Sequence, residues 1–426
     1  MVLYSALLLL VLVASSPWWL WQMAASGRYR AGLSGRLGRV PDHLRAASSN
    51  RHAGAGLLWL HAVSVGEVLA AETLVRAWRA AMPAWEIVIS TTTSTGQQIA
   101  RERLRTPAFY FPLDFAFAIR PYLRRLRPSL FVTMESELWP RMLMECERAG
   151  IPVAVVNARI SDRSLPRYLH LRVLWAPLLN KVAVFCAQSQ QSADRFLAIG
   201  VEAKRVCVTG NLKYDTPLPE SNTMVAHVQK MLSTAPLVVA GSTLEGEESI
   251  LLEQWPELLR RVPNAILLVA PRHPQRFDEV FALIGTKGMP CIRLSRLPAS
   301  AQTIAPGTVL LLDTLGDLAA MYGLAAVAFI GGSLVKKGGH NPLEATRFHI
   351  PVLMGPSYEN FREMVEPMLV QGAVHIVAAD NLAEALADVL ERPRAPLAFE
   401  TKESDATTDT MRRLQGLVEK LEAGRA

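Results

Sequence analysis

The chain has 426 residues, more than one ordinary domain holds, and this length predicts two domains. Hydrophobic residues make up 50% of the chain and aromatic residues only 7%, which is typical of a well-packed α/β protein and excludes a disordered one. The formal net charge of +7 favours an anionic partner, such as an anionic lipid or a phosphorylated substrate; nucleic acid ranks last because no basic stretch is interleaved with aromatic residues.

The first element is an uncharged apolar segment over residues 2–26. Because about 20 apolar residues cross the core of a bilayer, we expect residues 1–26 to form a membrane anchor. The alternatives are a cleaved signal peptide, although the segment lacks a basic start and Pro17 follows its small residues, and a hairpin half-inserted in the interface. Interfacial tryptophans and the arginines after them place the remaining chain in the cytoplasm: Trp18, Trp19, Trp21, Arg28, Arg30, Arg36, Arg39 and Arg45.

Strand and helix signals then alternate regularly. Short apolar runs bounded by turn residues predict buried parallel strands, and the segments between them predict helices. The first series of strands is expected at residues 57–63, 87–91, 108–111, 130–134, 153–157, 182–187 and 206–209. Such alternation is typical of a doubly wound parallel sheet.

A looser stretch with several prolines, residues 211–235, separates this series from a second one. The second series is expected at residues 237–240, 265–270, 309–312, 327–330, 352–354 and 374–377, followed by a helix over 405–424. We therefore predict Rossmann-like domains over residues 27–214 and 215–400 and a C-terminal helix over 401–426. Ligands of such sheets bind at the carboxyl ends of the strands, here in a central cleft that the two domains face.

Glu67 stands at the start of the helix that follows the first strand of this series. A carboxylate at that edge of the sheet can take a proton from an acceptor hydroxyl. The spacing of Ser64 and Glu67 also matches a helix capping box, so a purely structural role remains open. His61, just before this turn, is typical of a buried structural histidine.

Three further groups in the first half follow strands. Glu135 and Glu137 can share a proton or bind polar substrate, or they can cap the next helix. The segment after Asn157 interleaves basic and apolar residues, as a surface that contacts phosphates and acyl chains would, or a solvated helix face. Lys213 lies at the domain junction, where it can neutralise a leaving phosphate or remain an ordinary surface lysine.

The richest stretch of the second half is Val327–Thr346, a strand followed by two glycine pairs, two lysines and His340. Asn341 and Glu344 have the spacing of a helix N-cap and its capping partner, with a proline at the first helical position. Free backbone N–H groups at such a turn favour a phosphate site, although an ordinary capped loop is the alternative. Arg272 and Asp317 also follow strands, which predicts that they reach the same crevice.

Metal chemistry has no support in the sequence. The four cysteines lie far apart without a Cys-x-x-Cys pair, and the nine histidines show no metal-ligand spacing. The cysteines are typical of small buried side chains in a reducing compartment. We therefore expect no metal and no other cofactor.

Taken in order, these motifs resemble the Kdo (3-deoxy-D-manno-octulosonic acid) transferases of lipopolysaccharide synthesis. The blocks that carry the resemblance are Ser64–Glu67, Glu135–Pro140, Asn157–Ser161, Gly210–Lys213, Pro271–Pro274 and Gly339–Glu344. The resemblance extends over nearly the whole chain, from the N-terminal segment to beyond Met354-Gly355-Pro356.

The resemblance implies a GT-B fold and an inverting, metal-independent transfer of Kdo from CMP-Kdo to the acylated, bisphosphorylated disaccharide precursor of lipid A. It implies that Glu67 is the general base and that Glu135 and Lys213 support the transition state. The implied CMP-binding positions are Pro271, Arg272, Leu315, Gly316, Asp317, Asn341, Pro342, Leu343 and Glu344. For the acceptor, we expect contacts from Arg159, Arg163 and Arg167.

One departure from the family pattern lies at Leu315–Asp317, where Met-Gly-Glu is common, so a shorter carboxylate stands at that contact. Two other functions remain as alternatives. The first is a transferase or epimerase of the same fold that uses a UDP-sugar. The second is a membrane-tethered scaffold without activity.

Overall fold

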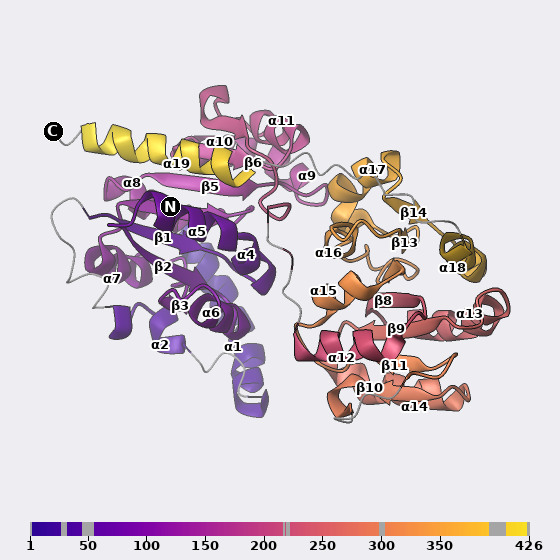
Figure 1. The fold of residues 1–426 in the computed structure, drawn as a ribbon. Helices are drawn as coiled ribbons and strands as arrows, with labels where there is room; N and C mark the ends of the chain where they lie inside the picture. The colour runs from indigo at the N-terminus through magenta and orange to yellow at the C-terminus, as the bar shows by residue number, and fades with distance from the viewer. Residues whose placement is uncertain are drawn as a thin grey trace. The chain divides into compact units, whose positions relative to one another are not determined.

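The computed structural model describes residues 2–26, 32–44, 55–215, 218, 222–297, 303–391 and 406–423 (Figure 1). It divides into two compact units: unit 1 comprises Met1–Pro217 and Lys402–Ala426, and unit 2 comprises Leu218–Thr401. Several residues used in the sequence analysis lie outside the described ones: Arg28, Arg30 and Arg45 after the N-terminal segment, and Pro217, Pro219 and Ser221 in the stretch between the units.

Unit 1 contains a sheet of seven strands in the order β3-β2-β1-β4-β5-β6-β7, with all neighbours parallel. The strands are β1 (Leu57–His61), β2 (Glu86–Thr91), β3 (Ala108–Tyr110), β4 (Leu130–Met134), β5 (Val153–Ala158), β6 (Val184–Ala187) and β7 (Val206–Val208). Alternate residues of β1 enter two different hydrophobic cores, with Leu57 and Trp59 in one and Leu58 and Leu60 in the other. Burial on both faces explains why these strands are continuous apolar runs in the sequence.

Unit 1 has one short helix before β1, α2, and further helices that connect its strands (Figure 1). They are α2 (Leu33–Arg36), α4 (Val65–Ala70), α5 (Glu72–Ala81), α6 (Ser94–Glu102), α7 (Ala116–Leu126), α8 (Pro140–Arg148), α9 (Leu165–His170), α10 (Arg172–Leu179) and α11 (Gln190–Ala198). The single helix predicted after the first strand is two helices that meet at Ala71. The C-terminal helix α19 (Ala406–Ala423) packs against α5 and buries Met411 and Leu414 in the core of unit 1.

Unit 2 has its own seven-stranded sheet in the order β10-β11-β9-β8-β12-β13-β14, again with all neighbours parallel. The strands are β8 (Leu237–Thr243), β9 (Ile266–Pro271), β10 (Cys291–Arg293), β11 (Val309–Leu311), β12 (Val327–Ile330), β13 (Val352–Met354) and β14 (Val374–Ile376). Strand β10 was not predicted from the sequence, because its three residues are only partly buried and show no apolar run.

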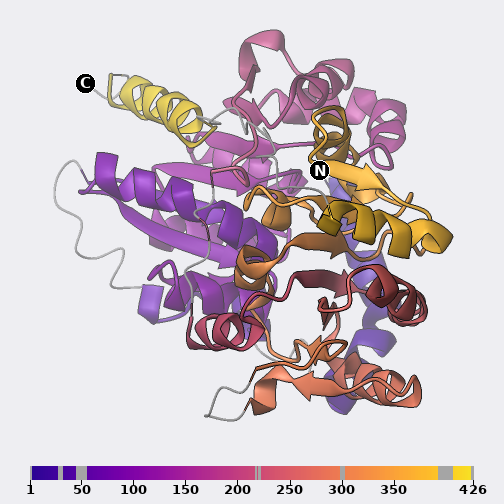
Figure 2. The same cartoon turned by 45° about the vertical axis from the view of Figure 1, so that its right-hand side comes forward.

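The helices of unit 2 are α12 (Thr223–Leu232), α13 (Glu247–Arg261), α14 (Phe277–Thr286), α15 (Leu318–Met321), α16 (Leu343–Thr346), α17 (Arg362–Val370) and α18 (Leu382–Glu391). Helix α12 lies within the stretch that the sequence analysis treated as loose. It begins at a conventional N-cap, in which the Asn222 side chain accepts a hydrogen bond from the N–H of Val225. Helices α13 and α18 pack side by side (Figure 2).

The N-terminal segment is a helix, α1 (Val2–Ser26), with Pro17 inside it. Large apolar side chains along this helix are exposed, namely those of Leu7, Leu9, Leu10, Val11, Val13, Trp18 and Trp21. Within the described residues, no helix combines the length and the apolar character that crossing a membrane requires. The membrane anchor therefore stays a prediction.

Candidate active site

In unit 1, the carboxyl ends of β1 and β4 form the edge at which a ligand is expected. The chain first adds β2 and β3 on one side of β1 and then adds β4 to β7 on the other side. The order in which strands are added therefore reverses between β1 and β4, while all strands stay parallel. Open α/β sheets bind ligands at this switch point. Glu67 follows β1 and Glu135 follows β4, which places the two predicted carboxylates on either side of it.

Glu67 forms a variant of the predicted capping box, in which its carboxylate accepts from the N–H of Val63 in place of that of the N-cap residue Ser64. Its N–H donates to the Ser64 Oγ over 3.4 Å, and its own carboxylate accepts from the N–H of Val63 at 2.8 Å and from the Ser64 hydroxyl at 3.2 Å. Its exposure is only 9%. The N-cap predicted at Ser64 is therefore confirmed, and the same bonds hold a carboxylate at the sheet edge in one orientation.

The protonation of Glu67 is what makes it a candidate base. Burial raises its pKa to about 7; the hydrogen bond from Val63 opposes this shift, and the charges of Glu135 and Glu137 add to it. A group with a pKa near the working pH can both accept and release a proton efficiently. Strong perturbation of a carboxylate by burial at such an edge is typical of functional sites.

Glu135 has the opposite electrostatic setting. Its carboxylate lies 2.8 Å from the Lys213 Nζ and 3.0 Å from the Arg159 Nε. Burial alone would raise its pKa, but these two cations outweigh burial and hold the pKa below its usual value. Two neighbouring carboxylates whose pKa values are shifted in opposite directions can take different roles. Here Glu135 is suited to remain an anion, and Glu67 is suited to exchange a proton.

Backbone geometry fixes this cluster. Glu135 and Asn157 both adopt positive φ angles, 53° in each case, at the ends of neighbouring strands. The buried Asn157 Oδ1 accepts from the N–H of Leu212 at 3.1 Å, and the Asn211 Oδ1 accepts from the N–H of Lys213 at 3.0 Å. Strained conformations of this kind persist where surrounding contacts enforce them and are common at active sites.

The histidine before this turn is structural, as its sequence context indicated. His61 is fully buried, its Nδ1 lies 3.0 Å from the Ser90 Oγ, and its ring stacks on Phe111 with centroids 3.9 Å apart. Burial lowers its pKa to about 3, so it stays neutral at physiological pH.

Of the three arginines predicted to contact the acceptor, only Arg159 joins the carboxylate cluster. Arg163 and Arg167 are exposed on the segment that leads into and through α9. The following helix α10 exposes apolar side chains as well, with Val173 at 86% and Leu174 at 71% exposure. The basic and apolar residues of this segment therefore lie together on an exposed surface of unit 1.

The switch point of unit 2 lies between β8 and β12, and there the structure corrects the sequence analysis. The fully buried Glu247 of α13 accepts hydrogen bonds from the N–H groups of Gly332, Ser333 and Leu334, at 2.6 to 2.9 Å, and of Leu244 at 2.9 Å. The glycine turn was predicted to offer free N–H groups to a phosphate. An internal carboxylate already occupies three of them, so it fixes the turn instead.

The sequence did not single out Glu247 because nothing local connects a helix start to a loop 85 residues later.

The helix after this loop begins one residue later than the predicted cap pattern indicated. The Asn341 Oδ1 accepts from the N–H of Leu343 at 3.1 Å, but α16 begins at Leu343 and has only four residues, and Pro342 precedes it. Glu344 is exposed. His340 lies against Gly332, and burial lowers its pKa to about 4, with the nearby Arg272 and His273 contributing.

The remaining predicted donor contacts come from the ends of β9 and β11, which are neighbouring strands. Pro271 ends β9, and the exposed Arg272 follows, with its N–H bonded to the Thr243 carbonyl at 2.9 Å. Leu315 is 75% exposed and Gly316 has a φ of 93°. The Asp317 carboxylate accepts from Asn222 at 2.6 Å and from Thr314 at 2.5 Å, so intramolecular bonds already orient it.

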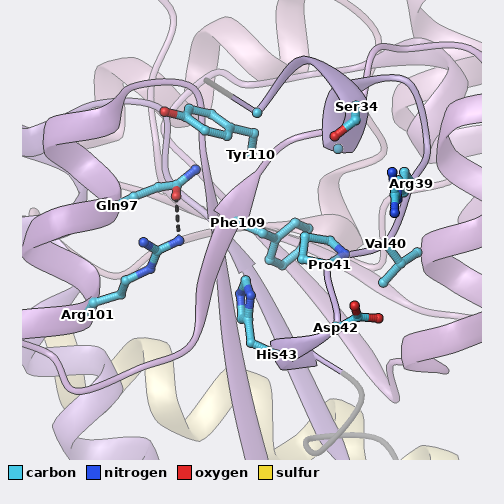
Figure 3. Close-up of a pocket in the computed structure, with 12 residues that line it drawn as sticks. Ser34, Arg39, Val40, Pro41, Asp42, His43, Gln97, Arg101, Phe109 and Tyr110 are labelled. Atoms are coloured by element: carbon cyan, nitrogen blue, oxygen red, sulfur yellow. Dashed lines mark hydrogen bonds between the residues drawn. The ribbon is translucent and has the colours of Figure 1, made fainter. Parts of the chain in front are cut away.

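Unit 1 also has a cavity of about 250 Å³ (Figure 3). Its lining includes Arg101 and His43, which both bond to the Ala108 carbonyl, and Gln97, which bonds to Arg101. None of the predicted site residues lines it. Among the residues that the structure describes, no group of three or more His, Cys, Asp or Glu side chains is arranged to hold a metal ion.

Comparison with known proteins agrees with the sequence motifs. Residues 31–216 match the family model described as 3-deoxy-D-manno-octulosonic-acid transferase (kdotransferase). A 3-deoxy-D-manno-octulosonic acid transferase from Haemophilus influenzae is 35% identical over 380 residues, which cover 86% of this chain and 83% of the relative. One from Bordetella pertussis is 33% identical over 373 residues, covering 83% of each.

Among solved structures, a UDP-GlcNAc 2-epimerase from Neisseria meningitidis bound to UDP-GlcNAc matches with a TM-score of 0.58 at 12% identity, over 85% of this chain and all of that one (100%). A UDP complex of MnaA from S. aureus matches with a TM-score of 0.56 at 12% identity, over 85% and 97%. At such identities the likeness concerns the fold, which is the GT-B-like arrangement of epimerases and glycosyltransferases. The identities above 30% over most of both chains show that this protein belongs to the 3-deoxy-D-manno-octulosonic acid (Kdo) transferase family.

Proposed function

We propose that this protein is an inverting glycosyltransferase that moves Kdo from CMP-Kdo to the tetraacylated, bisphosphorylated glucosamine disaccharide precursor of lipid A. The observation that carries this proposal is the pair of carboxylates at the switch point of unit 1, where Glu67 has a pKa near 7 beside an ionised Glu135. Family membership supports the nature of the transferred sugar.

The reaction needs one base on the acceptor side. Glu67 takes the proton of the acceptor hydroxyl, the acceptor oxygen attacks the anomeric carbon of Kdo, and the bond from that carbon to the CMP phosphate oxygen breaks. A single displacement inverts the configuration. Because Lys213 and Arg159 are fixed cations beside Glu135, we propose that they stabilise the developing negative charge and that no metal is needed.

We assign CMP to the carboxyl edge of the unit 2 sheet. Arg272 is exposed there and is suited to a phosphate or a cytosine edge. Because Glu247 already accepts hydrogen bonds from the N–H groups of the glycine turn, we propose that the turn shapes the CMP site without binding the phosphate itself. The phosphate is then bound by side chains such as Arg272 and by the Asn341–Glu344 segment. The proposed CMP contacts are Pro271, Arg272, Leu315, Gly316, Asp317, Asn341, Pro342, Leu343 and Glu344.

The acceptor is a membrane lipid, and two features of unit 1 fit that. Helix α1 exposes a row of apolar side chains, and α9 and α10 expose basic and apolar residues together. We propose that α1 anchors the protein at the cytoplasmic side of the inner membrane and that Arg163 and Arg167 contact acceptor phosphates.

The decisive experiment incubates the purified protein with the lipid A precursor and CMP-Kdo and measures the product by mass spectrometry. A mass increase of one or more Kdo units supports the proposal, and an unchanged acceptor contradicts it. A second measurement separates the UDP-sugar alternative: CMP, but not UDP, should protect the protein against thermal unfolding. Protection by UDP alone would favour the alternative.

A further inference from the structure

Asp114 is a buried carboxylate that no motif singled out. It lies in the loop between β3 and α7 and is 3% exposed. Its Oδ2 accepts from the N–H of Arg141 at 2.9 Å and from the Tyr4 hydroxyl at 2.8 Å, and its Oδ1 accepts from the N–H of Met142 at 2.8 Å. This one side chain therefore connects the N-terminal helix α1 to the start of α8.

The bonds to Arg141 and Met142 make Asp114 the cap of α8. Trp139 is the residue before this helix, and among the described residues its side chain makes no capping bond. A helix start leaves N–H groups without partners and favours a negative charge, so a carboxylate from another loop takes the place of a local cap. The start of α8 is therefore fixed from outside the helix.

The turn just before α8 carries part of the candidate site. Glu135 and Glu137 lie in the turn between β4 and α8, so the position of the helix start sets where that turn ends. Ring contacts add to this connection. The ring centroids of Trp139 and Phe111 lie 5.5 Å apart, and Phe111 stacks on His61 at the end of β1, the strand that leads to Glu67.

The described stretch after α1, residues 32–44, contacts the same loop and the helix α7 that follows the loop. The N–H of Leu113 donates to the Arg36 carbonyl at 2.8 Å. The Tyr122 hydroxyl donates to the Gly35 carbonyl at 3.0 Å. This segment also lines the cavity beside β3 (Figure 3). The loop that presents Asp114 is thus held by the stretch that follows α1 as well as by Tyr4 of α1 itself.

We propose that Asp114 and Tyr4 are positioning residues that make the placement of Glu135 and Glu137 depend on the seating of the N-terminal helix. The inference rests on the proposed function for the meaning of those carboxylates, but the mechanical connection stands on the contacts alone. When α1 packs against unit 1, the Tyr4 hydroxyl completes the hydrogen bonds to Asp114, and Asp114 holds the start of α8. When α1 leaves, Asp114 loses one donor and the turn before α8 loosens.

The mechanical connection is tested by hydrogen exchange on the full chain. Asp114→Asn should speed amide exchange at Arg141 and Met142 at least tenfold, and Tyr4→Phe, which removes only the hydroxyl that bonds to Asp114, should speed it several-fold at the same amides. Glu145→Gln is the comparison variant: Glu145 is a buried carboxylate of the same helix that binds the side chains of Arg120, Arg141 and Arg148, and among the described residues it accepts no backbone N–H at the helix start. Unchanged exchange at these amides in both variants overturns the proposal.

The catalytic consequence is tested by transfer kinetics. Because a misplacement of about 1 Å can cost a hundredfold, we expect kcat to fall about tenfold or more in Asp114→Asn with the KM for CMP-Kdo unchanged. The acidic limb of the pH profile of kcat should also move to lower pH. Glu135 and Glu137 are the charged groups that raise the pKa of Glu67, and a retreating turn weakens both effects.

Glu145→Gln should lower stability without moving the acidic limb of the pH profile.

Failure of the proposed function and failure of the mechanical connection give different results. A wild-type protein that transfers no Kdo but shows the expected exchange refutes the proposed function and keeps the connection. An active wild type whose Tyr4→Phe and Asp114→Asn variants keep both the exchange pattern and the pH profile refutes the connection.

Discussion

The pH dependence of transfer should report the proton affinity of Glu67. With a pKa of about 7, the carboxylate is half ionised at pH 7 and about one-tenth ionised at pH 6. If Glu67 is the base, kcat should therefore be about tenfold lower at pH 6 than on the plateau above pH 8. A glutamate with the ordinary value of 4.5 would give a flat profile over this range.

Glu67 should also make the stability of the protein depend on pH. The folded-state pKa of Glu67 lies above its unfolded value, so the folded state binds this proton more tightly; the resulting stability is complete below pH 4.5 and is lost as pH rises through about 7. The shift corresponds to about 3 kcal/mol. Glu67→Gln removes this dependence but gives up about 1 kcal/mol of hydrogen bonding, so it should be the more stable protein at pH 8.5 and the less stable one at pH 4.5.

The assay is steady-state transfer by purified protein between pH 5.5 and 9, with urea unfolding at both extremes. Glu67→Gln should lose about 10²- to 10⁴-fold in kcat and retain CMP binding. Ser64→Ala is the control: it breaks the capping box at a cost of about 1 kcal/mol but keeps the carboxylate. A flat wild-type profile between pH 6 and 8, or a Gln variant within tenfold of wild type, would refute the assignment of Glu67 as the base.

Four further predictions follow from the contacts. Lys213→Met should lower kcat at least tenfold and reduce thermal stability, because Glu135 then keeps only one cation; unchanged turnover would remove Lys213 from the site. Glu247→Gln should weaken CMP binding about tenfold in calorimetry by loosening the glycine turn, since an amide cannot accept all four N–H bonds, and unaltered affinity would contradict that shaping role. Arg272→Ala should raise the KM for CMP-Kdo but not for the acceptor, and the reverse result would place the donor elsewhere. Deleting residues 1–26 should release the protein from membranes and leave partial activity on detergent-dispersed acceptor; a truncated protein still bound to membranes at high salt would show that the anchor lies elsewhere.

Most of the fold could be predicted because buried parallel strands leave a strong local signal. The runs Leu130–Met134 and Val327–Ile330 were predicted to the residue, since both faces of these strands are buried and every position except Thr133 is apolar. Strand β10 and helix α12 were missed for the opposite reason. The first is short and half-buried, and the second follows a proline-rich stretch that resembles a linker.

The sequence also predicted which groups come to the carboxyl edge of each sheet, because a residue just after a parallel strand must lie there. It could not predict which of them bind one another. Lys213 and Glu135 are 78 residues apart, and their contact depends on strand order. The same holds for Glu247, which fills a turn that the local pattern left open to a phosphate.

The amino-acid sequence by itself determined the positions of most strands, the N-cap at Ser64 and the family motifs, because each depends on residues close together in the chain. Only the tertiary structure decided that Glu67 titrates near 7, that Glu135 stays ionised, and that Asp114 caps a distant helix. The physical reason is that the proton affinity and hydrogen bonding of a buried carboxylate depend on desolvation and on neighbours that folding brings from elsewhere in the chain.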